Sequence, residues 1–382
     1  MGYVHLEVET AQTPKRPHTC CGDVVLVERQ ASATTVLLCD GLGSGVKAEV
    51  AATACGTRIR ALLRAGFSPR AAFDRVIRTM NEARTTDLPF SAFTLLRVGT
   101  DGSTTAILYE MPDVLLLGSG HASVLASRKR SVEGAVIGEV NCHLMPGEGI
   151  LLVSDGVTQA GIGTGWRKGW GIDEAARYAS SRLAEGLPVR ELPQAVHDRA
   201  REIWGAGPGD DCTAVLAACR TGHSVTILTG PPADRARDHE VVRDFLERDG
   251  ARVVCGGTTA GIVARVQGTK VEVEHEAEGS ITPPRYWIEG IDCVTEGAVT
   301  LNQLYNVWGE SAALMEEESG VSELLALLEE ADRVTIMMGA ARNPATDSLS
   351  YRQQGILSRE RIVPLIADRL TADGKLVIVE RV

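Results

Sequence analysis

The sequence predicts an α+β chain in two parts, a layered sandwich followed by a smaller α/β domain. Through residues 1–220 the signals run as strands, a helix pair, strands, a second helix pair and a strand. That order is typical of a sandwich with sheets in the middle and helices outside. Through residues 221–382 strands and helices alternate, which is typical of an α/β domain with a parallel or mixed, Rossmann-like sheet. No linker rich in glycine, serine or proline joins the two parts.

Hydrophobic periodicity and turn signals place the elements of the first part. Ser68 followed by Pro69 is the start signal of the second helix, because proline is favoured in the first helical turn. The predicted elements, in order, are strands at 24–29 and 35–39, helices at about 46–64 and 69–81, the strands "SAFTLLRVG", "STTAILYE", "VLLLGSG", "HASVLAS" and "GILLVSDGV", helices at about 173–185 and 190–204, and the strand in "GDDCTAVLAAC".

The second part is predicted from the same signals. Its strands lie in "SVTILTGPP", "ARVVCGGTTAGIVARV", "RVTIMMGAARN" and "KLVIVERV", and its helices lie at about 234–249, 322–331 and 358–370. The stretch "VCGGTTAG" follows a strand and is able to cradle a phosphate or a nucleotide, although it is neither GxGxxG nor a P-loop, and tight packing is the alternative. The stretch "MMGAARNP" ends another strand at what would be the same sheet edge, which favours ligand sensing.

Composition narrows the classes of partner. The net charge of −11 argues against nucleic acid as the main partner, because binding to phosphates requires a basic surface. The apolar runs are too short to cross a membrane, and the first residues contain no apolar signal core. Nine cysteines without CxxC pairs fit a reducing compartment, so we expect a cytoplasmic protein. The adjacent Cys20 and Cys21 are either redox-sensitive thiols or ordinary half-buried side chains.

Five aspartates occupy strand ends in the first part. They are Asp23, Asp40, Asp155, Asp210 and Asp211. A single Asp-Gly pair is usually a turn, but two of these residues directly follow the buried strands "TVLLCD" and "ILLVSD". If neighbouring strands carry all five, their carboxylates converge and repel one another, and divalent cations remove that repulsion. Oxygen ligands select Mg²⁺ or Mn²⁺ rather than Zn²⁺.

Glycines surround the second of these aspartates in "CDGLGSG". We expect Gly41 to leave its carbonyl oxygen free to approach a metal ion. We expect Gly43 and Gly45 to clear space for a bulky anion beside the start of a helix.

The ordered set "GD", "DGLGSG", "SDGV" and "DDCT" resembles the metal-dependent PPM-type serine/threonine protein phosphatases, specifically the SpoIIE-like bacterial branch, over roughly residues 5–220. The resemblance implies a four-layer α-β-β-α sandwich and two Mn²⁺ or Mg²⁺ ions. It implies that Asp40 bridges both ions, the Gly41 carbonyl binds the first, and Asp155 and Asp210 bind the second. Asp23 and Asp211 would act through metal-bound waters, and a water between the ions would attack phosphoserine or phosphothreonine.

The sequence departs from the family pattern at three positions of these motifs. Leu42 stands where eukaryotic relatives have a histidine that is thought to protonate the leaving group, so turnover is expected to be modest. Ser44 replaces a histidine common in the bacterial motif, and Gln159 replaces a glutamate. The phosphate-binding arginine of eukaryotic members has no clear counterpart, although Lys15 and Arg16 lie in the corresponding stretch. His121 is expected to pack in a turn rather than to bind a metal.

The sequence therefore predicts a protein serine/threonine phosphatase, residues 1–220, followed by a regulatory or ligand-binding domain, residues 221–382. By analogy with the family, the substrate would be a phosphorylated regulatory protein such as an anti-sigma-factor antagonist. No nucleic acid or membrane partner is expected, and a homodimer is left open. Two alternatives remain: a sensor or binding module that uses the phosphatase fold with weak or no turnover, and a hydrolase of a small phosphorylated metabolite.

Overall fold

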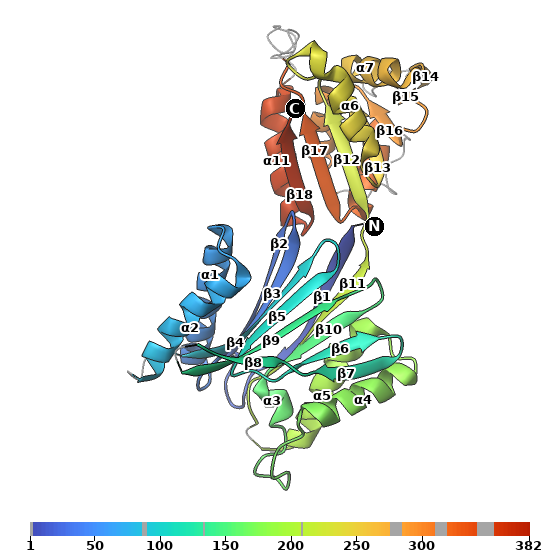
Figure 1. Ribbon diagram of the computed structural model, residues 1–382. Helices are drawn as coiled ribbons and strands as arrows, with labels where there is room; N and C mark the ends of the chain where they lie inside the picture. The colour runs from blue at the N-terminus through green and yellow to red at the C-terminus, as the bar shows by residue number, and fades with distance from the viewer. Residues whose placement is uncertain are drawn as a thin grey trace. The chain divides into compact units, whose positions relative to one another are not determined.

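The computed structural model describes residues 3–85, 90–132, 134–207, 209–275, 285–309, 319–341 and 355–382. The chain divides into two compact units, Tyr3–Thr221 and Gly222–Val382. The first is drawn mainly in blue and green and the second in yellow to red (Figure 1). Among the described residues, no helix is both long and apolar enough to cross a membrane.

A six-stranded antiparallel sheet carries the first helix pair (Figure 1). Leu37 and Phe93 of the sheet pack against Ile59 and Phe73 of the two helices, which cover its outer face. The strands, in sheet order, are β2 (Asp23–Gln30), β3 (Ala33–Gly41), β4 (Ser91–Gly99), β5 (Ser103–Tyr109), β9 (Ala135–His143) and β8 (Arg128–Val132), and the helices are α1 (Val46–Arg64) and α2 (Pro69–Thr85).

A five-stranded sheet carries the second helix pair. Leu151 and Leu216 of this sheet pack against Ala179 and Val196 of the helices. The strands, in sheet order, are β1 (Val4–Thr13), β11 (Cys212–Thr221), β10 (Gly149–Val153), β6 (Val114–Gly118) and β7 (His121–Leu125), and the helices are α3 (Asp155–Thr158), α4 (Ile172–Ala184), η1 (Val189–Glu191) and α5 (Leu192–Trp204).

The inner faces of the two sheets pack on each other. Leu38 and Leu96 of the six-stranded sheet share a buried cluster with Leu152 and Val215 of the five-stranded sheet. Leu37 and Leu38 are adjacent and belong to opposite faces, as the two-residue repeat of a strand requires. The N-terminal unit is therefore a four-layer α-β-β-α sandwich, as the resemblance implied.

Three strands of this unit were not predicted. β1 lies at one end of its sheet and β8 at one end of the other, so each has only one strand neighbour. β8 reads "RKRSV", a charged composition that protects a sheet edge from further pairing but carries little strand signal. β9 contains Gly138, which weakens the strand pattern of "AVIGEVNCH".

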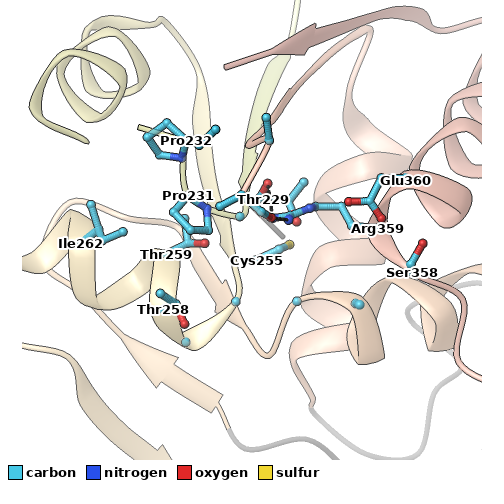
Figure 2. Close-up of a pocket in the computed structure, with 18 of the residues that line it drawn as sticks. Thr229, Pro231, Pro232, Cys255, Thr258, Thr259, Ile262, Ser358, Arg359 and Glu360 are labelled. Carbon is cyan, nitrogen blue, oxygen red and sulfur yellow. Dashed lines mark hydrogen bonds between the residues drawn. The ribbon is translucent and has the colours of Figure 1, made fainter. Parts of the chain in front are cut away.

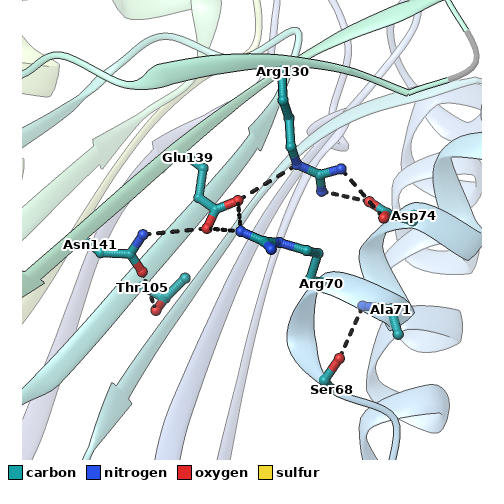
Figure 3. A network of polar contacts seen from close by, with 8 residues as sticks. All are labelled: Ser68, Arg70, Ala71, Asp74, Thr105, Arg130, Glu139 and Asn141. Carbon is teal, nitrogen blue, oxygen red and sulfur yellow. Dashed lines mark hydrogen bonds and ion pairs between the residues drawn. The ribbon is translucent and has the colours of Figure 1, made fainter.

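A polar network fixes α2 to β8 and β9 (Figure 3). Arg70 of α2 donates to Glu139 Oε2 of β9 over 2.7 Å, and Arg130 of β8 pairs with Asp74 of α2 over 2.6 Å. Arg130 Nε also lies 3.6 Å from Glu139 Oε2, which joins the two ion pairs. The network holds the helix layer on its sheet by charge as well as by apolar packing.

The C-terminal unit has a seven-stranded mixed sheet with helices on both faces (Figure 1). Ile227 packs toward one helix layer and Leu228 toward the other. In sheet order the strands are β14 (Glu272–His275), β15 (Arg285–Trp287), β16 (Cys293–Thr295), β13 (Ala251–Cys255), β12 (Ser224–Thr229), β17 (Arg333–Met338) and β18 (Leu376–Arg381). One face of the sheet carries η2 (Arg235–Arg237), α6 (Asp238–Glu247) and α7 (Gly257–Gln267). The other face carries α8 (Ala298–Asn306), α9 (Gly320–Glu330) and α11 (Arg359–Ala372).

The five strands from β16 to β18 are parallel, and β14 and β15 are antiparallel additions. The chain builds outward from β12 through β13 to β16 and then returns to β17 on the other side of β12. β14, β15 and β16 were not predicted, since they are only three or four residues long. Neither α7 nor α8 was predicted, and the residues of α7 were assigned to the strand that in fact ends at Cys255. The part of "MMGAARNP" after Ala341 lies outside the described residues.

Candidate metal centre

The strand register places two of the predicted aspartates side by side. Asp23 is the first residue of β2, and Asp40 is the next-to-last residue of β3. In this antiparallel pair Asp23 lies directly opposite Asp40. Directly opposed residues of an antiparallel pair project from the same face, so both side chains leave the sheet at the same edge.

The other sheet contributes the remaining three aspartates. Asp155 begins α3, two residues after the end of β10, and Asp210 and Asp211 directly precede β11. A pair of bonds holds these segments together: Ser154 N donates to Thr213 O over 2.9 Å, and Thr213 N donates to Ser154 Oγ over 3.0 Å. Asp155 and the Asp210–Asp211 pair are thus fixed at neighbouring strand ends.

Thr213 connects the two sheets at this edge. Its hydroxyl donates to Asp23 Oδ2 over 2.6 Å. Gln12 of β1 donates to the Asp23 carbonyl and to the Thr213 hydroxyl, each over 3.0 Å. In addition, Asp40 and Asp155 lie close enough for each carboxyl group to shift the pKa of the other. The structure therefore brings carboxylates from both sheets together.

The pKa values of the aspartates show that nearby positive charge does not balance their negative charge. Burial, followed by repulsion from Asp23 and Asp155, raises the pKa of Asp40 to about 10. Burial also raises the pKa of Asp23 to about 7, against the opposing effect of the Thr213 hydroxyl. The pKa of Asp155 is raised by burial and then by Asp210. In the metal-free protein a shared proton has to relieve this repulsion.

The cationic contribution of the protein to the cluster is small. Lys15 Nζ lies 3.4 Å from Asp210 Oδ1, and both side chains are partly exposed, so the pair adds little stability. The Lys15 backbone N–H donates to Asp211 Oδ1 over 2.8 Å. One ammonium group cannot balance five carboxylates.

Two buried oxygen atoms fit the presence of a cation. Asp23 Oδ1 and Asp211 Oδ2 have no hydrogen-bond partner among the described residues, and both side chains are at most 4% exposed. Buried carboxylate oxygens without partners are costly unless a cation or a water occupies the space beside them. As the side chains stand, no three histidine, cysteine, aspartate or glutamate groups within the described residues are already arranged around one ion. The donor set thus suits a hard divalent cation, and binding one would draw the carboxylates inward.

Glycines make this close approach of segments possible. A Cβ atom on Gly41 would lie 2.0 Å from the carbonyl oxygen of Ala48 in α1. A Cβ atom on Gly156 would lie 1.9 Å from the Asp211 carbonyl oxygen. Both positions therefore require glycine for packing. Gly43, by contrast, has a φ of 100° and open space around it.

The remaining residues of the loop range from the buried Gly45 to the exposed Leu42. Gly45 has a φ of 70° and is the N-cap residue of α1. Leu42 is 70% exposed, so its side chain does not fill the position of the missing histidine. Ser44 Oγ lies 3.0 Å from His18 Nε2, and His18 was not predicted because no motif marks it. Gln159 Nε2 donates to Asp155 Oδ2 over 2.8 Å, so this departure from the family pattern still touches the cluster.

Two other predicted sites behave as ordinary structural residues. Cys20 and Cys21 are half-buried, and burial raises the pKa of both thiols, which disfavours the reactive thiolate. His121 is exposed at the start of β7 and lies 3.3 Å from Ser180 Oγ of α4, so it contacts a neighbouring helix.

Comparison with known families decides what kind of domain surrounds this cluster. The family model of stage II sporulation protein E (SpoIIE) matches residues 30–220, which is half of the chain. The chain belongs to the SpoIIE family. Its N-terminal unit is therefore a metal-dependent protein serine/threonine phosphatase domain. No curated protein matches the chain.

Solved structures with the same type of domain are more distant. The PP2C phosphatase domain of SpoIIE from Bacillus subtilis, with a fragment of its regulatory domain, is 17% identical, with a TM-score of 0.48. The alignment covers 58% of this chain and 65% of that one, a little under two thirds. The RsbU and RsbW domains of a Mycobacterium tuberculosis protein are 16% identical over 64% of this chain and 68% of that chain, with a TM-score of 0.49. RsbX in complex with magnesium is 15% identical over 57% of this chain and 100% of that chain, with a TM-score of 0.42.

Proposed function

We propose that the whole protein hydrolyses phosphoserine or phosphothreonine on a regulatory protein and that the C-terminal unit regulates this activity. Two Mn²⁺ or Mg²⁺ ions would be held by Asp40, Asp155 and Asp210 with the Gly41 carbonyl, and through waters by Asp23 and Asp211. The observation that carries the proposal is the meeting of these aspartates, from two sheets, within a SpoIIE-family domain.

The protein residues have distinct tasks in this proposal. Bound ions supply Lewis acidity, which lowers the pKa of a water molecule and offsets the charge of the phosphoryl group. Thr213 and Gln12 orient Asp23, and Gln159 orients Asp155. Leu42 cannot donate a proton to the leaving group, so turnover is expected to be modest.

An apolar stripe beside the cluster favours a protein substrate over a small metabolite. Leu42, Val46 and Val50 are 70%, 67% and 57% exposed. Val46 and Val50 are four residues apart on α1 and therefore share one face of the helix, and Leu42 lies in the loop that precedes it. Exposed aliphatic side chains that line up next to a reaction centre fit the surface of another protein.

The basic test is hydrolysis of p-nitrophenyl phosphate by the full chain with and without Mn²⁺. We expect activity only with the metal and its loss in Asp155→Asn. The sensor alternative would be supported by Mn²⁺ binding without hydrolysis, and this outcome would reject the proposed enzyme.

A second test separates a protein substrate from a small one. Changing Leu42, Val46 and Val50 together to serine should lower kcat/KM for a phosphoprotein but not for p-nitrophenyl phosphate. Val136→Ser is the matched control, because Val136 is 61% exposed and lies on β9, on another part of the unit. Equal loss on both substrates would favour the metabolite hydrolase.

A further inference from the structure

We propose that the C-terminal unit binds a small phosphorylated molecule of about nucleotide size in the cavity at the carboxyl ends of its central strands. The regulatory meaning of such binding rests on the function proposed above, but the binding itself does not.

The cavity lies beside the end of β12, at the point where the strand order changes direction (Figure 2). β12 pairs in parallel with β13 on one side and with β17 on the other, and the cavity is lined by the residues that follow these strands. In open α/β sheets, ligands bind outside the carboxyl ends of the strands at this switch point. The volume of about 1400 Å³ leaves room for a nucleotide-sized ligand.

Glycine follows four of the parallel strands at this edge. Gly230 comes directly after β12, Gly256 after β13 and Gly339 after β17, whereas Gly297 follows β16 after Glu296, which also lines the cavity. A Cβ atom on Gly230 would lie 0.9 Å from Arg359 Nη1, so side chains there would displace the arginine. A Cβ atom on Gly297 would lie 3.0 Å from the Gly256 Cα. The backbone at this edge is therefore bare and close to the cavity.

Three helices begin at the cavity wall. α7, α8 and α11 have Gly256, Gly297 and Ser358 as N-cap residues, and all three line the cavity. None of these N-caps forms a side-chain hydrogen bond to its helix. In α7 and α8 the first N–H groups therefore remain available, and each helix dipole places partial positive charge there. Convergent, uncapped N-termini are suited to phosphate.

The buried Thr259 and the half-buried Arg359 point independently to a ligand. Thr259, in the first turn of α7, is 3% exposed, and its hydroxyl oxygen has no hydrogen-bond partner among the described residues. Arg359 crosses the strand ends, where Nη1 donates to Thr229 O over 3.1 Å and Nη2 to Ala341 O over 2.7 Å (Figure 2). Its buried Nε has no partner in the described part of the chain. Burial lowers the pKa of Arg359, yet a guanidinium stays charged in proteins.

Part of the opposite cavity wall is apolar. Pro231, Pro232 and Ile262 lie opposite Arg359 (Figure 2). Inorganic phosphate alone would leave this wall and most of the volume unused. An organic group attached to the phosphate would cover it, which is why the proposed ligand is a phosphate ester or anhydride rather than a free ion.

The test is isothermal titration of the full chain with ADP and with inorganic pyrophosphate, in EDTA so that the phosphatase centre holds no metal. The informative variant is Gly257→Glu. Gly257 lines the cavity at the first position of α7, and its added Cβ would meet nothing within 4 Å. An acidic residue there suits the helix but repels a phosphate. Gly261→Glu is the matched control, because Gly261 is also on α7 with open space and is not part of the cavity wall.

We expect the wild type and Gly261→Glu to bind ADP equally. Gly257→Glu should bind at least about a hundredfold more weakly, from repulsion between charges about 4 Å apart. Thermal unfolding should show that both variants are folded. Absence of binding of both probes to the wild type, or equal binding by Gly257→Glu, would overturn the inference. Neither result would affect Mn²⁺-dependent hydrolysis, so the two proposals fail separately.

Discussion

Removing the charge of Asp40 should stabilise the metal-free protein against unfolding. The same change should abolish the metal-dependent activity. Asp40→Asn keeps the size of the side chain and removes an acidic group from a cluster that lacks compensating cations. The buried environment and the carboxylates of Asp23 and Asp155 hold the pKa of Asp40 at about 10, against 3.8 for an unperturbed aspartate. In the metal-free state at neutral pH, Asp40 is therefore protonated when folded and ionised when unfolded.

The magnitude follows from proton linkage. Between pH 3.8 and pH 7, protonating an ordinary aspartate costs about 1.4 kcal/mol per pH unit, or about 4 kcal/mol in all. Because Asp23 and Asp155 take up part of the proton, about 2 kcal/mol is expected for this single group. Below pH 3.8 the penalty is absent, and it grows as the pH rises toward 10. The advantage of asparagine should therefore increase from pH 5 to pH 8.

Thermal unfolding in EDTA at several pH values measures the difference in stability between Asp40→Asn and the wild type. At pH 8, Asp40→Asn should unfold roughly 4–8 °C above the wild type, given the size of the unit. With Mn²⁺ added, the wild type should gain stability and the variant should gain little, because an amide is a poor ligand for a hard cation. An equal or lower unfolding temperature for the variant in EDTA, or a difference that does not change with pH, would refute the reasoning.

Asp101→Asn is the control of opposite sign. Asp101 is exposed, and hydrogen bonds from the side chain and backbone of Ser103 lower the pKa of its carboxyl group. Losing that charge should give no gain in stability at any pH and should not alter the effect of Mn²⁺. A gain equal to that of Asp40→Asn would show that net charge, and not the local cluster, is responsible.

Three further substitutions test the surroundings of the cluster. Gly41→Ala drives a methyl group into the Ala48 carbonyl and should lower the free energy of unfolding by at least about 2 kcal/mol; an unchanged urea midpoint would contradict this. Gly43→Val should cost only about 1 kcal/mol of backbone strain but reduce turnover with p-nitrophenyl phosphate, and full turnover would mean that the loop does not border the phosphate. Thr213→Val removes the donor to Asp23 and should weaken Mn²⁺ binding about tenfold by calorimetry, whereas equal affinity would remove Thr213 from the site.

The parts of the site that were predictable from the sequence are those where local pattern and function coincide. Asp40 and Asp155 follow long apolar runs that are buried on both faces, and such runs can be read without knowledge of the fold. Thr213 and Gln12 carry no such mark, because their partners are 190 and 11 residues away in the sequence. Their roles emerge only when the two sheets are packed on each other.

The packing constraint on the glycines could not be predicted either, because it depends on segments that are distant in the sequence. The sequence shows that Gly41 and Gly156 follow acidic residues, which favours a role for their backbone near a ligand. In the structure the immediate constraint is the neighbouring chain, since any side chain would strike the Ala48 or the Asp211 carbonyl. Tight packing and metal chemistry are compatible here, because the close approach of segments is what brings mutually repelling carboxylates within reach of one ion. A cluster that opposes folding without metal and favours it with metal makes the stability of this unit respond to the cation that its reaction requires.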